Sequence, residues 1–426
     1  MVGVLVLAQA SSFLDRMILG LLVGPIRQTF EISDTQFSLL AGLAFTLFYA
    51  AMGLPLARIA DTRSGRALIG IGIAVWSVMT ALCGAAKGFW SLFVARVGVG
   101  VGEATLGPAA FSLIADYFPR AVLARAFSLY MCGVAVGSGV AYMIGGSVVA
   151  AVAGMPDVIV PVIGAVHGWQ LTFFIVGLPG LVVALLMTTV REPVRKGLLP
   201  TAQSEVPVKE VIRYVWRRRA GYGALMVGVS VFVMVVYAFN LWGPTYFIRV
   251  FDLSIAEAGW TFGSIMLIAG TAGLLVAGFI ADAWRRRGRI DAYPRTILIS
   301  MALMAPFAVG LAFVESLSVA IPTIFMAVFF SAFQGGLTGG ALQLMTPNQM
   351  RGQVSALYFV LANLVGLGLG PTVVAGITDY VFADDRAIGK SLSLTAAVLC
   401  PLGGIILWSG LPRIRRLLDD TESWDR

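Results

Sequence analysis

Apolar runs, each about as long as the roughly 20 residues that a helix needs to cross a bilayer, follow one another along the whole chain. The pattern predicts an all-α integral membrane protein with twelve transmembrane helices. They are expected at 3–25, 35–57, 66–86, 90–115, 122–148, 169–190, 222–247, 258–281, 294–314, 318–345, 352–379 and 389–412. The first run lacks a basic start and a small-residue cleavage site, so we expect a span there rather than a signal peptide.

The chain contains an internal repeat. Phe30, Ser33, Gly42 and Asp61 reappear as Phe251, Ser254, Gly263 and Asp282, each displaced by 221 residues. The repeat predicts two pseudo-symmetric six-helix halves. The expected parts are an N-terminal bundle at 1–190, a cytoplasmic linker at 191–220, a C-terminal bundle at 221–413 and a cytoplasmic tail at 414–426. Parallel halves of this kind place a binding site at their interface, near the bilayer midplane.

The linker contains one amphipathic segment. Its apolar residues fall on one helical face and are Val208, Val211, Ile212, Val215 and Trp216, while Lys209, Arg213, Arg217, Arg218 and Arg219 occupy the rest. This pattern predicts a helix that lies on the inner membrane surface. A regulatory or lipid-sensing role has no support in the sequence itself.

Charge placement adds the orientation. Of the 30 Lys and Arg residues, 23 lie in the even-numbered connections and at the carboxyl end, and 5 lie in the odd-numbered connections. Because cytoplasmic loops collect Lys and Arg, both termini are expected in the cytoplasm, in a bacterial plasma membrane. The same bias accounts for the net charge of +8, so nucleic acid is not an expected partner.

Cysteine and histidine offer little chemistry. Cys83, Cys132 and Cys400 all lie in apolar runs, and His167 is the single histidine, in an outer connection. The cysteines are expected to pack as small apolar residues, and His167 to lie in a solvated loop. Neither a metal site nor a cofactor is expected.

Four charges lie deep within the predicted spans: Asp15, Arg16, Arg96 and Glu103. A charge at mid-bilayer costs roughly 2.5–3.5 kcal/mol even on the lenient insertion scale, so such residues face a partner or a watery cavity. Arg96 and Glu103 are two turns apart on one helical face, about 10 Å. Gly98, Gly100 and Gly102 between them permit close approach of neighbouring helices. These features indicate a protein that moves a solute or a proton through the membrane.

Our hypothesis is that Asp15 and Glu103 are the proton-responsive acids. Arg16 and Arg96 would hold them or bind an anionic substrate head. A carboxylate that an arginine holds in one conformation and releases in another gains and loses a proton. The alternative is a purely structural ion-pair network that fixes the packing of the first and fourth spans.

Two connections carry a family resemblance. RIADTRSGR (58–66) and GFIADAWRRRGR (278–289) resemble the inner loops of the major facilitator superfamily, in which an acid precedes a Gly/Arg cluster. The resemblance implies a cytoplasmic gate built from Asp61 with Arg63 or Arg66, and from Asp282 with Arg285, Arg286 or Arg287. The first copy departs from the pattern, with Ala57 in place of Gly and one inserted residue, which leaves the partner of Asp61 open.

A second resemblance is narrower. FLDRM (13–17), ARVGVGVGEATLGPAAFSLIADYFP (95–119), ARAFSLYMCGVAVGSGVAYMIGG (124–146) and GLGLGPTVVAGITD (366–379) are similar to the Spinster subfamily of facilitators. That similarity implies transport of lysolipids and sphingoid phosphates, as in the animal members of the subfamily, for which linkage to protons is a proposal.

A substrate cavity is expected to have aromatic and amide walls. Candidate residues are Phe45, Tyr49, Tyr130, Tyr237, Trp242 and Gln334. An apolar-aromatic cavity with charges on one wall suits an amphiphile. The expected function is proton-coupled export of a lipid-like substrate by alternating access, with the bilayer and protons as further partners and the protein a monomer.

Four alternatives differ in how well the sequence supports them. A broad drug/proton antiporter and an organic-anion/proton symporter fit the same fold. A membrane enzyme such as a lipid transferase is disfavoured, because His167 has no carboxylate five residues on to serve an acyl-transfer motif. A non-transporting sensor would leave the duplicated loops and the midplane acids without a purpose.

Overall fold

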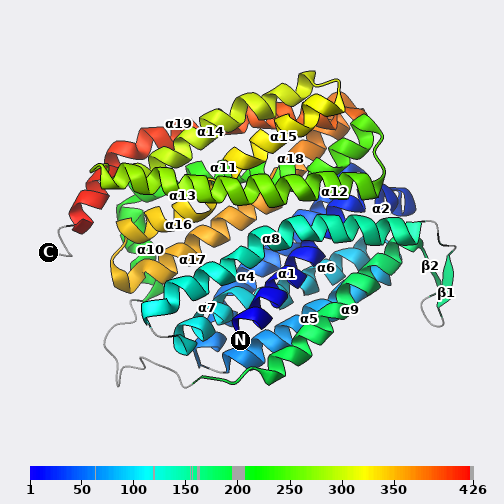
Figure 1. The fold of residues 1–426 in the computed structure, drawn as a ribbon, viewed down its shortest axis with the longest axis horizontal. Helices are drawn as coiled ribbons and strands as arrows, with labels where there is room; N and C mark the ends of the chain where they lie inside the picture. The colour runs from blue at the N-terminus through cyan, green and yellow to red at the C-terminus, as the bar shows by residue number, and fades with distance from the viewer. Residues whose placement is uncertain are drawn as a thin grey trace. The chain divides into compact units, whose positions relative to one another are not determined.

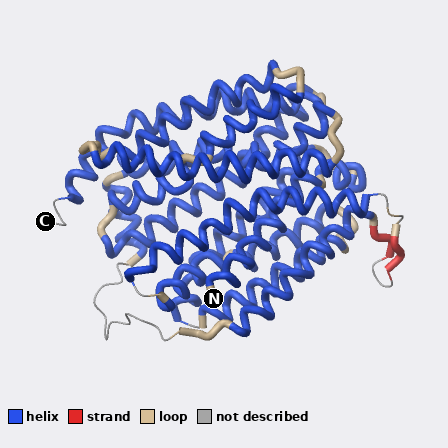
Figure 2. Tube along the Cα trace, viewed as in Figure 1, coloured by secondary structure: helices blue, strands red, loops and turns tan. Residues whose placement is uncertain are grey.

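The computed structural model describes residues 1–62, 64–118, 120–153, 155, 157–160, 164–193 and 207–422. Within this part of the chain nearly every residue is helical (Figure 2). Among the described residues, eleven helical segments are long and apolar enough to span a bilayer. A shorter apolar stretch, Val136–Val152, lies in the long helix at the predicted fifth span. The expected all-α membrane fold is confirmed.

The chain forms two compact units. Unit 1 comprises Met1–Leu198, Asn240–Leu267 and Ala375–Ile388, and unit 2 comprises Leu199–Phe239, Ile268–Val374 and Gly389–Arg426. Unit 1 thus combines the first six spans with two stretches from the second half of the sequence. The division at residues 190 and 221 stays a prediction about the repeat.

The elements of unit 1 are mostly long helices and their short continuations. They are α1 (Val2–Met17), η1 (Ile18–Leu21), α2 (Val23–Phe30), α3 (Asp34–Ser38), η2 (Leu39–Leu43), α4 (Ala44–Thr62), α5 (Gly65–Gly84), α6 (Phe89–Glu103), α7 (Leu106–Tyr117), α8 (Arg120–Ala153), β1 (Val158–Val160), β2 (Gly164–Val166), α9 (Gly168–Thr189), α12 (Ile255–Ile265), η7 (Ile377–Phe382) and η8 (Asp385–Ala387). Helices α1, α5, α6, α8 and α9 pack side by side (Figure 1).

Unit 2 has the same character. Its elements are α10 (Val208–Arg217), α13 (Thr271–Arg286), α14 (Ala292–Gly310), η4 (Leu311–Phe313), α15 (Leu317–Ser331), α16 (Gln334–Met345), η5 (Asn348–Met350), α17 (Arg351–Ala362) and η6 (Asn363–Leu367). Four elements have residues in both units: α11 (Arg219–Phe251), η3 (Met266–Gly270), α18 (Gly368–Gly376) and α19 (Ile388–Glu422). Helices α13, α14 and α15 pack on one another.

The internal repeat is visible in local geometry. Ser33 and Ser254 each begin a helix, and each side chain accepts a hydrogen bond from the backbone N–H three residues on, in a reciprocal capping box with Gln36 or Glu257. Two residues before each serine, Glu31 and Asp252 both have a φ of 53°. Two copies of one bend, 221 residues apart, support the common ancestry of the halves.

The glycines of α6 permit close helix packing, as expected. A Cβ atom on Gly100 would lie 2.5 Å from the carbonyl oxygen of Phe45, in α4. One on Gly102 would lie 2.7 Å from the backbone nitrogen of Trp76, in α5. Only glycine fits at such distances, so α6 is held directly against the backbones of α4 and α5.

The fourth span is broken. Helix α6 ends at Glu103 and α7 begins at Leu106. Pro108 lies in the first turn of α7, where its missing N–H costs least, and it cannot donate to the carbonyl oxygen of residue 104. Glu103 therefore lies at a helix end. Two residues on, the hydroxyl of Thr105 donates a hydrogen bond to the carbonyl oxygen of Gly102.

Candidate functional site

The four charges of the predicted spans lie within one group, the buried charge group, made of Ser12, Asp15, Arg16, Arg96 and Glu103. The first three are on α1 and the last two on α6. Asp15, Arg96 and Glu103 are each 1% exposed, and the Arg16 side chain is 16% exposed. Arg16 is thus the member of the group most open to solvent.

Glu103 pairs with Arg16. Its Oε2 accepts hydrogen bonds from Arg16 Nε at 2.5 Å and from the Ser12 hydroxyl at 2.6 Å, whereas its Oε1 is buried without a hydrogen-bond partner among the described residues. The pair links α1 to α6. The two-turn spacing of Arg96 and Glu103 does not bring those two residues into an ion pair.

Asp15 and Arg96 are less completely paired. Arg96 Nη1 donates to the backbone carbonyl oxygen of Asp15 at 3.4 Å, and no ion pair joins Arg96 to an acid in the part of the chain that the structure describes. Both carboxylate oxygens of Asp15 and the Nε of Arg96 are buried without a hydrogen-bond partner there. An unsatisfied buried charge is costly, more so than the roughly 1–3 kcal/mol of a neutral group.

Polar groups on α5 share this condition. The indole N–H of Trp76 and the hydroxyls of Ser77 and Thr80 are also buried with no hydrogen-bond partner among the described residues. Buried polar groups in folded proteins are almost always hydrogen-bonded, and the exceptions call for an explanation such as a functional role.

Aromatic rings surround the guanidinium of Arg16. It lies 5.6 Å from the centroid of Phe13, 4.6 Å from that of Phe45 and 5.2 Å from that of Tyr49. The rings of Phe45 and Tyr49 are stacked, with centroids 5.4 Å apart, and Arg96 lies 5.5 Å from Phe45. Phe45 and Tyr49, two of the predicted cavity residues, therefore contact the buried charge group by cation–π interactions.

The other predicted cavity residues lie elsewhere. In unit 1, Tyr130 is buried and donates to Gln9 Oε1 at 2.6 Å, and Trp242 is buried against the edge of Phe37. Tyr237 and Gln334 belong to unit 2, where the Tyr237 hydroxyl donates to Asn363 Oδ1 at 3.5 Å. A cavity lined by all six remains a prediction.

The predicted cytoplasmic gate is only partly visible. The side chain of Asp61 and all of Arg63 lie outside the described residues. Arg66 Nη1 donates to the carbonyl oxygens of Thr188 and Val190 at the end of α9, at 3.4 and 3.3 Å. The partner of Asp61 stays open.

In unit 2, no ion pair between described residues joins Asp282 to Arg285 or Arg286. Arg285 lies over the ring of Tyr293. The gate stays a prediction for both copies.

An acid that the sequence analysis did not select is paired in unit 2. Asp291 accepts from Arg295 Nε at 2.7 Å and from Arg415 Nε. Burial alone would raise the pKa of Asp291, but the hydrogen bonds and charges of the two arginines outweigh it and hold this pKa below its usual value. The signal in the sequence was the i,i+4 spacing of Asp291 and Arg295.

A second charge cluster in unit 1 was also missed. We call Arg27, Asp34, Arg249, Asp379 and Asp385 the outer charge group. Asp34, whose side chain is fully buried, accepts from Arg249 Nη1 and Nη2 at 2.5 and 2.7 Å, and Arg27 Nη1 lies 3.2 Å from its Oδ1. Arg27 Nη1 also donates to Asp385 at 2.6 Å. Burial would lower the pKa of Arg27, but these acids raise it overall.

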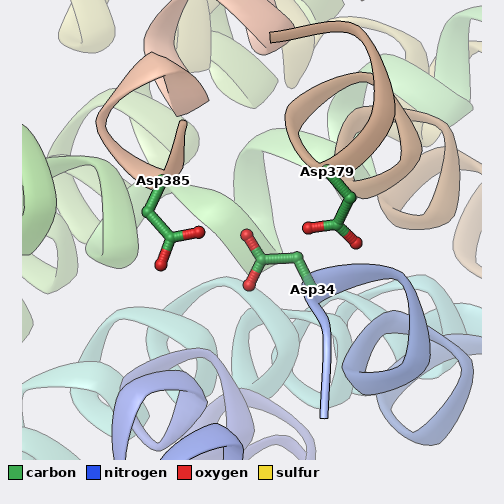
Figure 3. A group of neighbouring side chains, drawn as sticks. All are labelled: Asp34, Asp379 and Asp385. Atoms are coloured by element: carbon green, nitrogen blue, oxygen red, sulfur yellow. The ribbon is translucent and has the colours of Figure 1, made fainter. Parts of the chain in front are cut away.

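Asp379 completes the outer charge group. It accepts from the backbone N–H and the hydroxyl of Thr35, at 2.7 and 2.6 Å. Carboxylate oxygens of Asp34, Asp379 and Asp385 all lie within 4.8 Å of one another (Figure 3). Such a group could hold a cation, but Arg27 and Arg249 already supply the positive charge, so the geometry fits an ion-pair network.

The sequence contained one signal for this network. Asp34 lies in the repeated segment, at the position where the second copy has Ile255. The charge of Asp34 is therefore not part of the repeat. Without the fold, nothing placed Arg249 and Asp385 beside it.

Comparisons with known proteins agree with the fold. The family profile of the Major Facilitator Superfamily matches residues 5–371. An MFS-type efflux pump of Mycolicibacterium smegmatis is 29% identical over 97% of this chain and 93% of its own length. A probable L-galactonate transporter of Escherichia coli is 23% identical, covering 92% and 85%, and Xenopus laevis Protein spinster homolog 1 is 26% identical, covering 94% and 78%.

Among solved structures, a bacterial homolog of the human lysosomal transporter Spinster, in an inward-facing and unoccupied conformation, superposes with a TM-score of 0.79. It is 24% identical, and the match covers 98% of this chain and 97% of that one. At this identity the likeness concerns the fold.

Proposed function

The chain belongs to the Major Facilitator Superfamily, a family of transporters rather than enzymes, and we propose that it exports an amphiphilic, lipid-like substrate in exchange for protons by alternating access. The membrane is a bacterial plasma membrane with both termini in the cytoplasm, and the working unit is a monomer. The buried charge group carries the proposal.

Proton coupling needs an acid whose surroundings change during the cycle. Glu103 is held through one oxygen by Arg16, and Asp15 has no hydrogen-bond donor on either oxygen among the described residues. When Arg16 turns to a substrate or the helices shift, Glu103 loses its partner and its affinity for a proton rises. Asp15, which directly precedes Arg16 in α1, responds to the same movement.

The surroundings of Arg16 support an amphiphile. A guanidinium bordered by Phe13, Phe45 and Tyr49 offers a charged contact for a polar head beside an apolar surface for a chain. The efflux pump among the relatives supports outward transport, and the resemblance of the sequence to the Spinster subfamily implies a substrate of this class.

A second candidate is symport of an organic anion with protons. The L-galactonate relative and the exposed edge of Arg16 favour it. A sugar acid would use the same guanidinium but would leave the aromatic rings without a chain to cover. A drug/proton antiporter, which the efflux-pump relative favours, would instead bind a cationic substrate beside Asp15 and Glu103.

The test uses purified protein in liposomes with an imposed pH gradient. We expect counter-flow of a labelled lysolipid, with proton movement, and little counter-flow of a sugar acid or a cationic dye. In Glu103→Gln and Asp15→Asn the pH dependence should disappear, while Glu315→Gln, an exposed acid of unit 2, should behave as the wild type. Unchanged rates and unchanged pH dependence in both buried-site variants would overturn the proton assignment, and sugar-acid flow would overturn the substrate class.

A further inference from the structure

Helix α10 (Val208–Arg217) precedes the membrane span of α11, with Arg218 as the link between them. Three of its apolar residues are exposed in the part of the chain that the structure describes. Val208 is 40%, Ile212 51% and Trp216 68% exposed. An apolar face of this kind beside a membrane span calls for a covering partner.

The three residues form one stripe. At about 100° per residue, Val208, Ile212 and Trp216 lie within about 80° of one another. Lys209, Arg213 and Arg217, all exposed, occupy the next sector of the helix. An apolar stripe bordered by a basic stripe is the pattern of a helix lying in the bilayer interface, with its cations at the headgroups.

The opposite side of α10 is fixed to the protein. Val211 is 2% exposed and lies about 160° around the helix from Arg213, and α10 packs on α17. The ring of Tyr214 packs edge-on against Tyr222 of α11, with centroids 6.0 Å apart. Because this side is anchored, the apolar and basic stripes keep a fixed orientation.

The anchor reaches the connection between two spans. The Tyr222 hydroxyl donates to the carbonyl oxygen of Met345 at 2.6 Å, at the end of α16. Arg351, the first residue of α17, donates to the carbonyl oxygen of Thr346. Helix α10 is therefore tied to the segment that joins α16 to α17.

We propose that α10 is a binding surface for anionic phospholipid of the adjoining leaflet. Lys209, Arg213 and Arg217 hold the acidic headgroups, and Val208, Ile212 and Trp216 enter the acyl boundary. Charge complementarity selects acidic lipid over zwitterionic lipid. Continuity with the first turn of α11 selects a bilayer over a soluble partner. This inference is independent of the transported substrate.

Binding is tested on the full chain in nanodiscs of phosphatidylcholine with or without phosphatidylglycerol. The retained phosphatidylglycerol is measured by native mass spectrometry. Changing Lys209, Arg213 and Arg217 to Gln together should abolish the preference for phosphatidylglycerol, with each charge contributing up to about fivefold at low salt. The preference of the wild type should weaken as salt rises.

The matched control removes the same number of exposed charges elsewhere in unit 2, through Arg289→Gln, Arg413→Gln and Arg416→Gln. It should retain the preference, as should the conservative set Lys209→Arg, Arg213→Lys and Arg217→Lys. An equal loss in the control would show general attraction to a basic face and would overturn the site. A triple α10 variant that retains the lipid would overturn it as well.

The apolar stripe has its own readout. The difference in fluorescence between the wild type and Trp216→Phe isolates one tryptophan. Lipid brominated near the headgroup should quench that signal strongly. If it does not, the stripe is covered by protein rather than lipid, and the proposal fails even when the charges attract phosphatidylglycerol.

Discussion

The two charge groups of unit 1 differ in how fully they are paired. In the outer charge group, both oxygens of Asp34 face arginine nitrogens. Arg27 Nη1 also donates to Asp385, and Arg249 Nη2 lies 4.0 Å from the same carboxylate. In the buried charge group, Asp15 has no hydrogen-bond donor among the described residues and Glu103 is satisfied on one oxygen alone. Both groups join distant parts of the sequence.

The difference teaches what each group is suited to do. A fully paired cluster stabilises one arrangement of its helices, since every alternative leaves a charge uncompensated. An incompletely paired cluster loses less when its partners change, so it can serve two arrangements. The outer charge group is therefore suited to holding a conformation, and the buried charge group to changing with one.

The largest expected effect comes from Asp34→Asn. The change leaves Arg27 and Arg249 facing a neutral amide in a mostly buried site, a loss of about 3–5 kcal/mol for a buried pair. We expect a lower unfolding temperature in detergent and easier chemical labelling of the surface around the outer charge group. Asp252→Asn, which breaks the exposed pair with Arg386, should cost about 1 kcal/mol or less. Equal effects of the two would erase the contrast between buried and exposed pairs.

Glu103→Gln should have a smaller effect on stability and a larger one on transport. The amide keeps the bond from Ser12 but loses a charge-assisted bond from Arg16, worth about 1.5–3 kcal/mol. We expect transport to fall at least about tenfold and its pH dependence to flatten, as measured in proteoliposomes. If Glu103→Gln is strongly destabilised and yet transports with the wild-type pH profile, the buried charge group has a structural role and no role in proton coupling.

Gly100→Ala tests whether the close contact of α6 with α4 places the ring of Phe45 over Arg16. The new methyl group would lie 2.5 Å from the Phe45 carbonyl oxygen, so α4 must move away from α6, at a cost of about 1–3 kcal/mol. Phe45 would then leave its place over Arg16. Gly107→Ala, with no atom within 4 Å of its added Cβ, is the control and should be nearly neutral. The unfolding temperature and the transport rate are measured for both variants, and both should fall in Gly100→Ala and not in Gly107→Ala.

The smallest effect concerns Asp291. Because its pKa is lowered in the folded protein, the ion pairs contribute stability above the ordinary carboxyl pKa of about 4, and the contribution disappears as the pH falls through the lower folded-state value. The partners are partly exposed, so the gain is about 1 kcal/mol or less. Asp291→Asn should lower the unfolding temperature at neutral pH and not at strongly acid pH. A constant difference at every pH would contradict the linkage.

The sequence predicted the spans, the repeat and the four buried charges because each depends on local composition. It could not assign Glu103 to Arg16 rather than Arg96, since that depends on the rotation of α1 against α6. Asp34, Arg249 and Asp385 lie in or beside connections far apart in the chain, where charges are usually solvated. Only the fold brings them together. The hairpin of β1 and β2 was also missed, because three-residue strands give almost no periodic signal.

The left-handed bend before Ser33 and Ser254 shows which features the two copies of the repeat have kept in common. The two copies share the backbone turn and the capping serine. They differ in the residue at the bend and in the residue that completes the cap, which are Glu31 and Gln36 in one copy and Asp252 and Glu257 in the other. Asp34 has no charged counterpart in the second copy. The bend and its cap are therefore common to both copies, whereas the buried carboxylate that holds the outer charge group belongs to the first copy alone.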